Sequence, residues 1–164
     1  MSAPMPPTGV AVTVQAEVRA SLEHTFQTIV PIDLASIFHG LGPLPAVVAT
    51  REQTGAWDHA GATRVVEMAD GSQAREELTA YAAPTHFAYR LTDFTGPLRH
   101  LARHVDGAWW FSCANGRTHI RWAYVFEPRW GRAGLIRLAV APLWRAYATR
   151  ALALAARAAE APAI

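Results

Sequence analysis

The sequence contains only one cysteine and no long apolar run, and each of these absences excludes a class of protein; it also contains no lysine, so that all 15 basic residues are arginine. One cysteine excludes an internal disulfide framework, and we expect Cys113 to be a small buried hydrophobe. No apolar stretch approaches the roughly 20 residues that a transmembrane helix needs. The opening residues MSAPMPPTG carry neither the basic nor the apolar region of a signal peptide. We therefore expect a flexible tail at 1–9, no transmembrane segment and a cytoplasmic protein.

Signatures of cofactor-dependent and nucleophilic enzymes are also absent. At 40–43 proline replaces a glycine that a dinucleotide-binding loop needs. The chain has no Gly-x-Ser-x-Gly elbow, no phosphate-binding loop and no CxxC motif. Trp110 and Arg121 are the only aromatic and basic pair of the kind that binds nucleic acid, and a structural cation–π contact explains them. We expect no cofactor, no metal site and no nucleic-acid partner.

Charge is divided unevenly along the chain. Residues 1–98 hold five Arg against ten Asp and Glu, whereas residues 99–164 hold ten Arg against three acidic residues. A basic second half suits an acidic partner or an anionic membrane. If strands from both halves interleave, the charges mix instead, and the sequence leaves both alternatives open.

The pattern of apolar residues predicts one strand, two short helices, six further strands and a long helix. Residues 10–18 alternate apolar and polar side chains, which is typical of a strand. Ser21 is a suitable N-cap for a helix that ends before Pro31, and a second short helix fits 33–39. Strand-like runs follow at 46–53, 62–69, 73–81, 86–93, 104–113 and 118–127.

The strongest local signal is Asn115-Gly116, the dipeptide that best tolerates the positive φ angles of a two-residue hairpin turn. Counting outward from it pairs Trp109 with Trp122. Because side chains alternate across a strand, one face of this hairpin is almost wholly apolar and must be covered by another element. That face carries Trp109, Phe111, Cys113, Ile120, Trp122, Tyr124 and Phe126.

Residues 132–159 are alanine-rich and have helical periodicity. One stripe carries Ile136, Val140, Leu143, Tyr147, Ala151 and Leu154. Pro142 lies inside this stretch and predicts either a kink or the true start of the helix. Leu138 and Leu152 fall on the opposite side among arginines, where they would suit a homodimer contact or a bilayer.

This order of elements predicts an α+β fold for a single domain over residues 10–164. A curved antiparallel sheet of seven strands wraps around a long C-terminal helix, and two short helices follow the first strand. Such a sheet curves away from the helix at one end, and an alanine-rich helix fills little of the space. We therefore expect a cavity between sheet and helix, bordered by the loops at 40–45 and 54–61.

Three segments carry a resemblance to a known superfamily: GATRVVEMADGSQAREELTAY at 61–81, GPLPAVV at 42–48 and THIRWAYVFEP at 118–128. Together with the element order over about residues 10–158, they resemble the Bet v 1-like, START-related (SRPBCC) superfamily and its polyketide cyclase/dehydrase-type branch. The resemblance implies the helix-grip fold and a cavity for a hydrophobic or aromatic, lipid- or polyketide-like molecule. Because the superfamily includes aromatases and cyclases, a polyketide cyclase, aromatase or dehydratase acting on a carrier-bound chain is the alternative.

One cross-strand pair could place charge in that cavity. If Asp70-Gly71 forms a two-residue turn, Arg64 pairs with Glu77, and the pair either orients a polar ligand group or forms an exposed ion pair on the outer face. Tyr89 joins the pair only in one register, because a slip of one residue places Arg90 opposite Glu77 instead. The sequence does not decide which parity of these strands faces inward.

The expected site combines this pair with the aromatic face, although its tyrosines and tryptophans serve equally well as core residues. We expect ligand contacts from Phe38, Trp57, Arg64, Glu77, Tyr89, Trp109, Phe111, Trp122, Tyr124, Leu143 and Tyr147. If the chain is an enzyme, Arg64, Glu77 and Tyr89 are the candidates for carbonyl polarisation and proton transfer.

Overall fold

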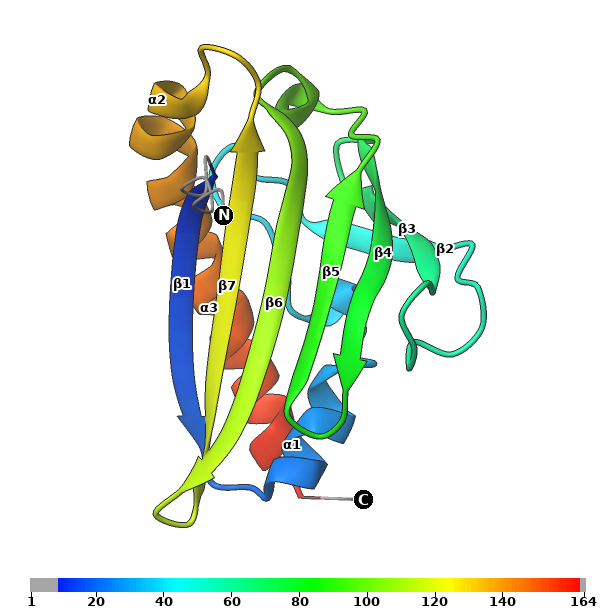
Figure 1. The fold of residues 1–164 in the computed structure, drawn as a ribbon, viewed down its shortest axis with the longest axis vertical. Coiled ribbons are helices and arrows are strands. Elements are labelled where there is room, and N and C mark those ends of the chain that lie inside the picture. The colour runs from blue at the N-terminus through cyan, green and yellow to red at the C-terminus, as the bar shows by residue number, and fades with distance from the viewer. Residues whose placement is uncertain (1–8, 163–164) are drawn as a thin grey trace, which may run out of the picture.

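The computed structural model describes residues 9–162 and shows a curved, seven-stranded antiparallel sheet around a long C-terminal helix (Figure 1). The strand order is β1-β7-β6-β5-β4-β3-β2, and every neighbouring pair is antiparallel. The strands are β1 (Val10–Val18), β2 (Val47–Arg51), β3 (Thr63–Met68), β4 (Gln73–Ala82), β5 (His86–Thr92), β6 (Ala102–Ala114) and β7 (Arg117–Pro128). The predicted α+β helix-grip fold is confirmed. Except for Gly9, the predicted tail at 1–9 lies outside the described residues.

The β6–β7 hairpin has the register that its turn predicted. Asn115 and Gly116 both have positive φ, and Trp109 pairs with Trp122. The apolar face is buried, whereas Arg121 lies over the ring of Trp110 on the outer face, 4.6 Å from its centroid. The prediction that Cys113 is buried is wrong: residues 112–117 are all exposed, because the hairpin tip extends past the covered part of the sheet.

Two short helical segments follow β1, as predicted. In α1 (Leu22–Ile29), the Ser21 hydroxyl accepts a hydrogen bond from the backbone N–H of His24 at 3.2 Å, and Phe26 and Ile29 are buried. The second segment, η1 (Leu34–Ser36), is a 3₁₀ turn shorter than the predicted helix. The helical turn ends at its C-cap residue, Ile37, and the Phe38 carbonyl then accepts a hydrogen bond from the backbone N–H of Val47 at the start of β2.

The C-terminal helix is continuous but changes geometry near its start. α2 (Ala133–Leu135) leads into the π-helical η3 (Ile136–Val140) and then into α3 (Ala141–Glu160). The widened π turn precedes Pro142, whose ring nitrogen cannot donate a hydrogen bond to the preceding turn. Within residues 9–162, no helix is both long and apolar enough to cross a bilayer.

The π turn explains an error in the predicted helix faces. Leu138 is exposed as expected, but Leu152 is buried together with Ala148, Ala155 and Ala159. A π turn holds about one residue more than an α turn, and one residue corresponds to about 100° around the axis. The buried stripe after η3 is therefore rotated by about this angle from the stripe that an ideal helix predicts, and Leu152 faces the sheet.

Candidate functional site

A cavity of about 480 Å³ lies between the inner face of the sheet and the C-terminal helix. Its walls come from the sheet, from η3 and the first turns of α3, and from the 29–47 segment. Exposed lining residues, among them Pro43, Pro97 and Ala139, mark its mouth. In Figure 1 the mouth corresponds to the upper end, where the β3–β4 turn, the 93–101 connection and the start of the C-terminal helix are found.

The opposite end of the interface is packed with rings. Phe26 on α1 makes edge contacts with Tyr81, Phe87 and Phe111, with ring centroids 5.4–6.2 Å apart. Phe87 stacks on Trp109 at 5.7 Å, and Phe111 stacks on Trp109 at 6.1 Å. This cluster closes the floor of the cavity.

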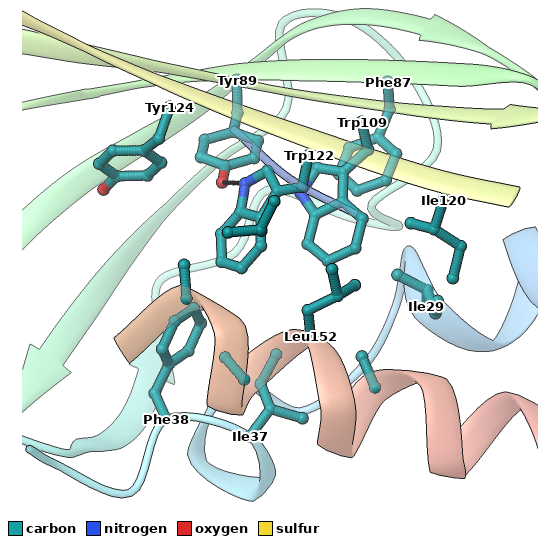
Figure 2. Packing of buried hydrophobic residues seen from close by; sticks show 14 of the residues in the cluster. Ile29, Ile37, Phe38, Phe87, Tyr89, Trp109, Ile120, Trp122, Tyr124 and Leu152 are labelled. Carbon is teal, nitrogen blue, oxygen red and sulfur yellow. Dashed lines mark hydrogen bonds between the residues drawn. The ribbon is translucent and has the colours of Figure 1, made fainter. Parts of the chain in front are cut away.

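The sheet wall of the cavity is a connected aromatic surface (Figure 2). Trp109 and Trp122 stack across β6 and β7 with centroids 4.5 Å apart. The indole N–H of Trp122 donates to the Tyr89 hydroxyl at 3.0 Å, as the dashed line in Figure 2 shows. On the helix side, Trp144 lies 4.2 Å from the ring of Tyr124. These contacts fix the orientation of the rings that a ligand would meet.

Gly107 gives Tyr89 its position. Gly107 on β6 pairs with Tyr89 on β5 and with Tyr124 on β7. A Cβ atom at position 107 would lie 2.2 Å from Cζ of Tyr89 and 2.5 Å from its hydroxyl oxygen. The phenol therefore lies flat against the backbone of β6, where any side chain other than hydrogen would displace it.

A buried ion pair lies in the wall formed by β3 and β4. Nη2 of Arg64 is 2.9 Å from Oε1 of Glu76, and the two side chains are 7% and 6% exposed. The Arg64 guanidinium also lies over the ring of Trp57, 4.1 Å from its centroid. Trp57 thus supports Arg64 from behind rather than lining the cavity itself.

The predicted pairing of Arg64 with Glu77 is wrong by one residue. The β3–β4 loop holds three residues, because the backbone N–H of Met68 donates to Ser72 across it, while the Asp70 carboxylate accepts from the Ser72 N–H. Arg64 therefore pairs with Glu76. Glu77 points outward, with its side chain 46% exposed and 3.8 Å from Arg75, which belongs to the same strand.

The register between β4 and β5 places Arg90 opposite Glu77, which is the second of the two registers that the sequence left open. Tyr89 instead pairs with Leu78 and reaches the cavity from the adjacent strand.

Burial controls the protonation of the site. It raises the pKa of the Glu76 carboxyl, although the nearby Arg64 guanidinium acts against this shift. Burial and the charge of Glu76 raise the pKa of the Tyr89 phenol. Burial also raises the pKa of Tyr147 to about 12. Both phenols therefore keep their protons at neutral pH, and Tyr147 donates to the Pro45 carbonyl at 2.5 Å.

Two buried N–H groups in the cavity wall have no acceptor within the described part of the chain. They are Nε of Arg64 and the indole Nε1 of Trp144. A buried donor without a partner costs about 1–3 kcal/mol. Two residues of the cavity wall, Arg64 and Trp144, therefore each carry a buried donor that no protein acceptor satisfies within the described residues.

This combination of fold and cavity agrees with a comparison of the sequence with known families. The profile described as "Polyketide cyclase / dehydrase and lipid transport" matches residues 9–160. The chain belongs to this family. It is a member of the Bet v 1-like, SRPBCC superfamily, as the sequence resemblance indicated. No curated protein matches the chain.

Solved structures support the family's fold at low sequence identity. A protein from Nitrosospira multiformis is 16% identical with a TM-score of 0.66, covering 90% of this chain and 94% of its own. An uncharacterized protein from Bacillus thuringiensis is 15% identical with a TM-score of 0.64, covering 91% and 98%. Ara h 8.0201, from the Bet v 1 family, is 16% identical with a TM-score of 0.63, covering 93% and 95%.

In this member of the polyketide cyclase/dehydrase and lipid transport family, most residues of the predicted site line one cavity. They are Phe38, Arg64, Tyr89, Trp109, Trp122, Tyr124, Leu143 and Tyr147. Trp57, Glu77 and Phe111 do not line it: Trp57 lies behind Arg64, Glu77 points outward and Phe111 packs under Phe26. The 40–45 loop contributes to the wall, whereas the 54–61 loop does not.

Two cavity residues escaped prediction, each because of one local irregularity. Glu76 was missed because the three-residue turn moved the register of β4 by one position. Trp144 was missed because it lies one position beyond the predicted helix stripe, in the direction that the π turn shifts the buried face. The only sequence signals were Ser72, which can hydrogen-bond Asp70 and extend the turn, and Pro142.

Proposed function

We propose that this protein binds a hydrophobic or aromatic small molecule, lipid-like or polyketide-like, in the cavity between sheet and helix. The observation that carries the proposal is an apolar, aromatic-walled cavity whose buried donors lack acceptors. Its volume of about 480 Å³ falls in the range of about 300–1,000 Å³ that small-molecule sites occupy. The family's description, which includes lipid transport, supports the same class of ligand.

The two unpartnered donors specify the polar part of the ligand. Arg64 presents a buried cation and Trp144 a neutral N–H, so each is suited to an oxygen acceptor such as a carbonyl or carboxylate. The flat rings of Trp109, Trp122 and Tyr124 suit the apolar or aromatic remainder. We infer a mainly apolar ligand with at least one oxygen that accepts a hydrogen bond from Arg64.

The test uses the fluorescent aromatic sulfonate 1-anilinonaphthalene-8-sulfonate, which combines an apolar ring system with anionic oxygens. We expect one site per chain, and Leu143→Trp should weaken binding at least about tenfold by filling the cavity. Ala146→Trp is the matched control, because Ala146 is exposed on the same helix and does not line the cavity. Equal affinities in two variants with unchanged melting curves would rule out the cavity as the binding site.

A second candidate function is a polyketide cyclase, aromatase or dehydratase acting on a chain carried by an acyl carrier protein. The buried Glu76 favours it, because a buried carboxyl with a raised pKa beside a cation can hold and transfer a proton more readily than an exposed carboxylate. Arg64 and Tyr89 would polarise a substrate carbonyl. Glu76, rather than the outward-pointing Glu77, would move the proton.

The two functions are separated by turnover of a thioester-linked β-polyketone. If the chain is an enzyme, Glu76→Gln should lower kcat about a hundredfold while the affinity for the fluorescent sulfonate changes little. Glu77→Gln, which alters the neighbouring carboxylate on the outer face, should retain full activity. Equal turnover in both variants would remove Glu76 from the chemistry.

A further inference from the structure

Three large apolar side chains are exposed within residues 130–138, around the start of the C-terminal helix. Trp130, Leu138 and Leu135 are 93%, 81% and 47% exposed, and we call these three residues the Trp130 patch. They come from the β7–α2 connection, from η3 and from α2, which lie at the upper end of the molecule in Figure 1. Single exposed apolar residues are common, but a cluster of them indicates a contact surface.

The surroundings of the Trp130 patch are strongly basic. Arg129, Arg132 and Arg137 are exposed and alternate with its residues along the chain. Residues 128–159 contain six Arg and no Asp or Glu, and Glu127 is the last acidic residue before this run. This segment of the chain therefore carries a large excess of positive charge.

The patch also borders the mouth of the cavity. The backbone N–H of Arg129 donates to the Leu101 carbonyl at 2.8 Å, and its Nε donates to the Arg99 carbonyl at 2.6 Å. These bonds hold the β7–α2 connection against the segment that contributes Leu98 and Leu101 to the cavity wall. On the other side, η3 carries Leu138 outward while Ala139 and Val140 line the cavity.

We propose that the Trp130 patch docks on an anionic lipid surface, with the mouth of the cavity facing the bilayer. A protruding tryptophan and leucines among arginines form the composition that enters the headgroup region, where arginine binds anionic lipid and the apolar side chains reach the acyl boundary. A second copy of the chain fits poorly, because a two-fold contact would place the three arginines of each patch against those of the other.

The test measures co-sedimentation of the full chain with vesicles of phosphatidylcholine, with and without phosphatidylglycerol, at physiological salt. We expect binding to the anionic vesicles and much weaker binding to the neutral ones. Trp130→Ser with Leu138→Ser should reduce the partition coefficient at least about tenfold. Arg132→Gln with Arg137→Gln should reduce it about thirtyfold on anionic vesicles, or about fivefold for each arginine.

The matched control is Trp110→Ser with Val48→Ser, which also removes one exposed tryptophan and one exposed aliphatic side chain, but away from the patch. This variant should bind vesicles like the parent chain. The proposal is overturned if the control and the patch variant lose binding equally, or if neutral and anionic vesicles bind alike. It is also overturned if the chain ignores both vesicles and the patch variant instead abolishes a dimer or binding to an acidic carrier protein.

Discussion

The inner face of the sheet is aromatic along its whole length, but its two ends are covered in different ways. At the closed end, α1 and the second half of α3 lie directly on the sheet, and Phe26 fills the space between the rings. At the open end, the same face continues with Trp122, Tyr89 and Tyr124, and the cavity lies between it and the helix. Ring composition alone therefore does not distinguish core from site.

The helix accounts for this difference. Its second half carries Ala148, Ala151, Ala155 and Ala159 on the buried side, and small side chains allow a close approach to the sheet. Its first half, after the π turn, carries Leu143 and Trp144 toward the cavity. Side chains at the closed end should therefore contribute to stability, and those at the open end to binding. Four predictions test this division, in order of decreasing expected effect.

Removing a ring at the closed end should cost the most stability. Phe26→Ala leaves a void among Tyr81, Phe87 and Phe111, and we expect a loss of about 3–5 kcal/mol in the free energy of unfolding. Leu143→Ala at the open end should cost less than about 2 kcal/mol, because this side chain already faces a cavity. Urea denaturation measures both, and equal losses would contradict the division.

The buried ion pair should contribute more to the free energy of unfolding than an exposed ion pair does. Arg64→Met leaves the Glu76 carboxyl buried without its counter-charge and should cost about 3 kcal/mol at pH 8. Arg90→Met removes the exposed pair with Asp106 and should cost less than about 1 kcal/mol. Urea denaturation of both variants at pH 8 tests this, and the Arg64→Met loss should shrink at pH 5, where Glu76 can take up a proton.

Gly107→Ala should disturb the open end through a single methyl group. The new Cβ overlaps the ring of Tyr89, so the phenol must move and its hydrogen bond with Trp122 breaks, at a cost of about 2 kcal/mol. Gly134→Ala on α2 meets no atom within 4 Å and should stabilise the helix by about 0.5–1 kcal/mol. Thermal melting and tryptophan fluorescence report both effects, and an unshifted spectrum in Gly107→Ala would contradict the assigned packing.

The pH dependence of stability should show that the pKa of Glu76 is raised in the folded chain. Because its pKa is raised in the folded state, the native chain holds more protons than the unfolded chain as the pH rises above 4.5, the usual value. Stability therefore falls as the pH rises from the unfolded to the folded pKa, with a slope of at most about 1.4 kcal/mol per pH unit. Glu76→Gln should abolish this fall, so that its stability no longer decreases with pH in this range, as urea denaturation across pH 4–9 would show. Glu77→Gln should follow the parent.

Prediction from sequence succeeded where a short-range signal determines geometry. Asn115-Gly116 fixed the pairing of two long strands, because two adjacent positive φ angles leave few turn types. It failed at Asp70-Gly71, where the Ser72 side chain and backbone both bond to Asp70 and the loop gains a residue. A shift of one residue exchanges the two faces of β4, so Glu76 and Glu77 changed places.

The C-terminal helix shows the same limit of prediction from sequence, because there too one extra residue in a turn shifts the positions that follow. Periodicity located the helix and several of its inward residues, including Leu143, Tyr147 and Ala151, but the extra residue in the π turn rotates the buried stripe that follows it. Leu152 was therefore assigned to the outer side although it is buried. The cavity volume and the unpartnered donors depend on packing between distant segments, which a local pattern does not contain.

The exposed thiol of Cys113 has a practical consequence for biophysical measurement. It is the only cysteine of the chain and lies near the tip of the β6–β7 hairpin, at the opposite end of the long axis from α2 (Figure 1). A maleimide dye will therefore label one position without mutagenesis, far from the cavity mouth. Energy transfer from this dye to an acceptor in the vesicle membrane would then report which end of the molecule faces the lipid.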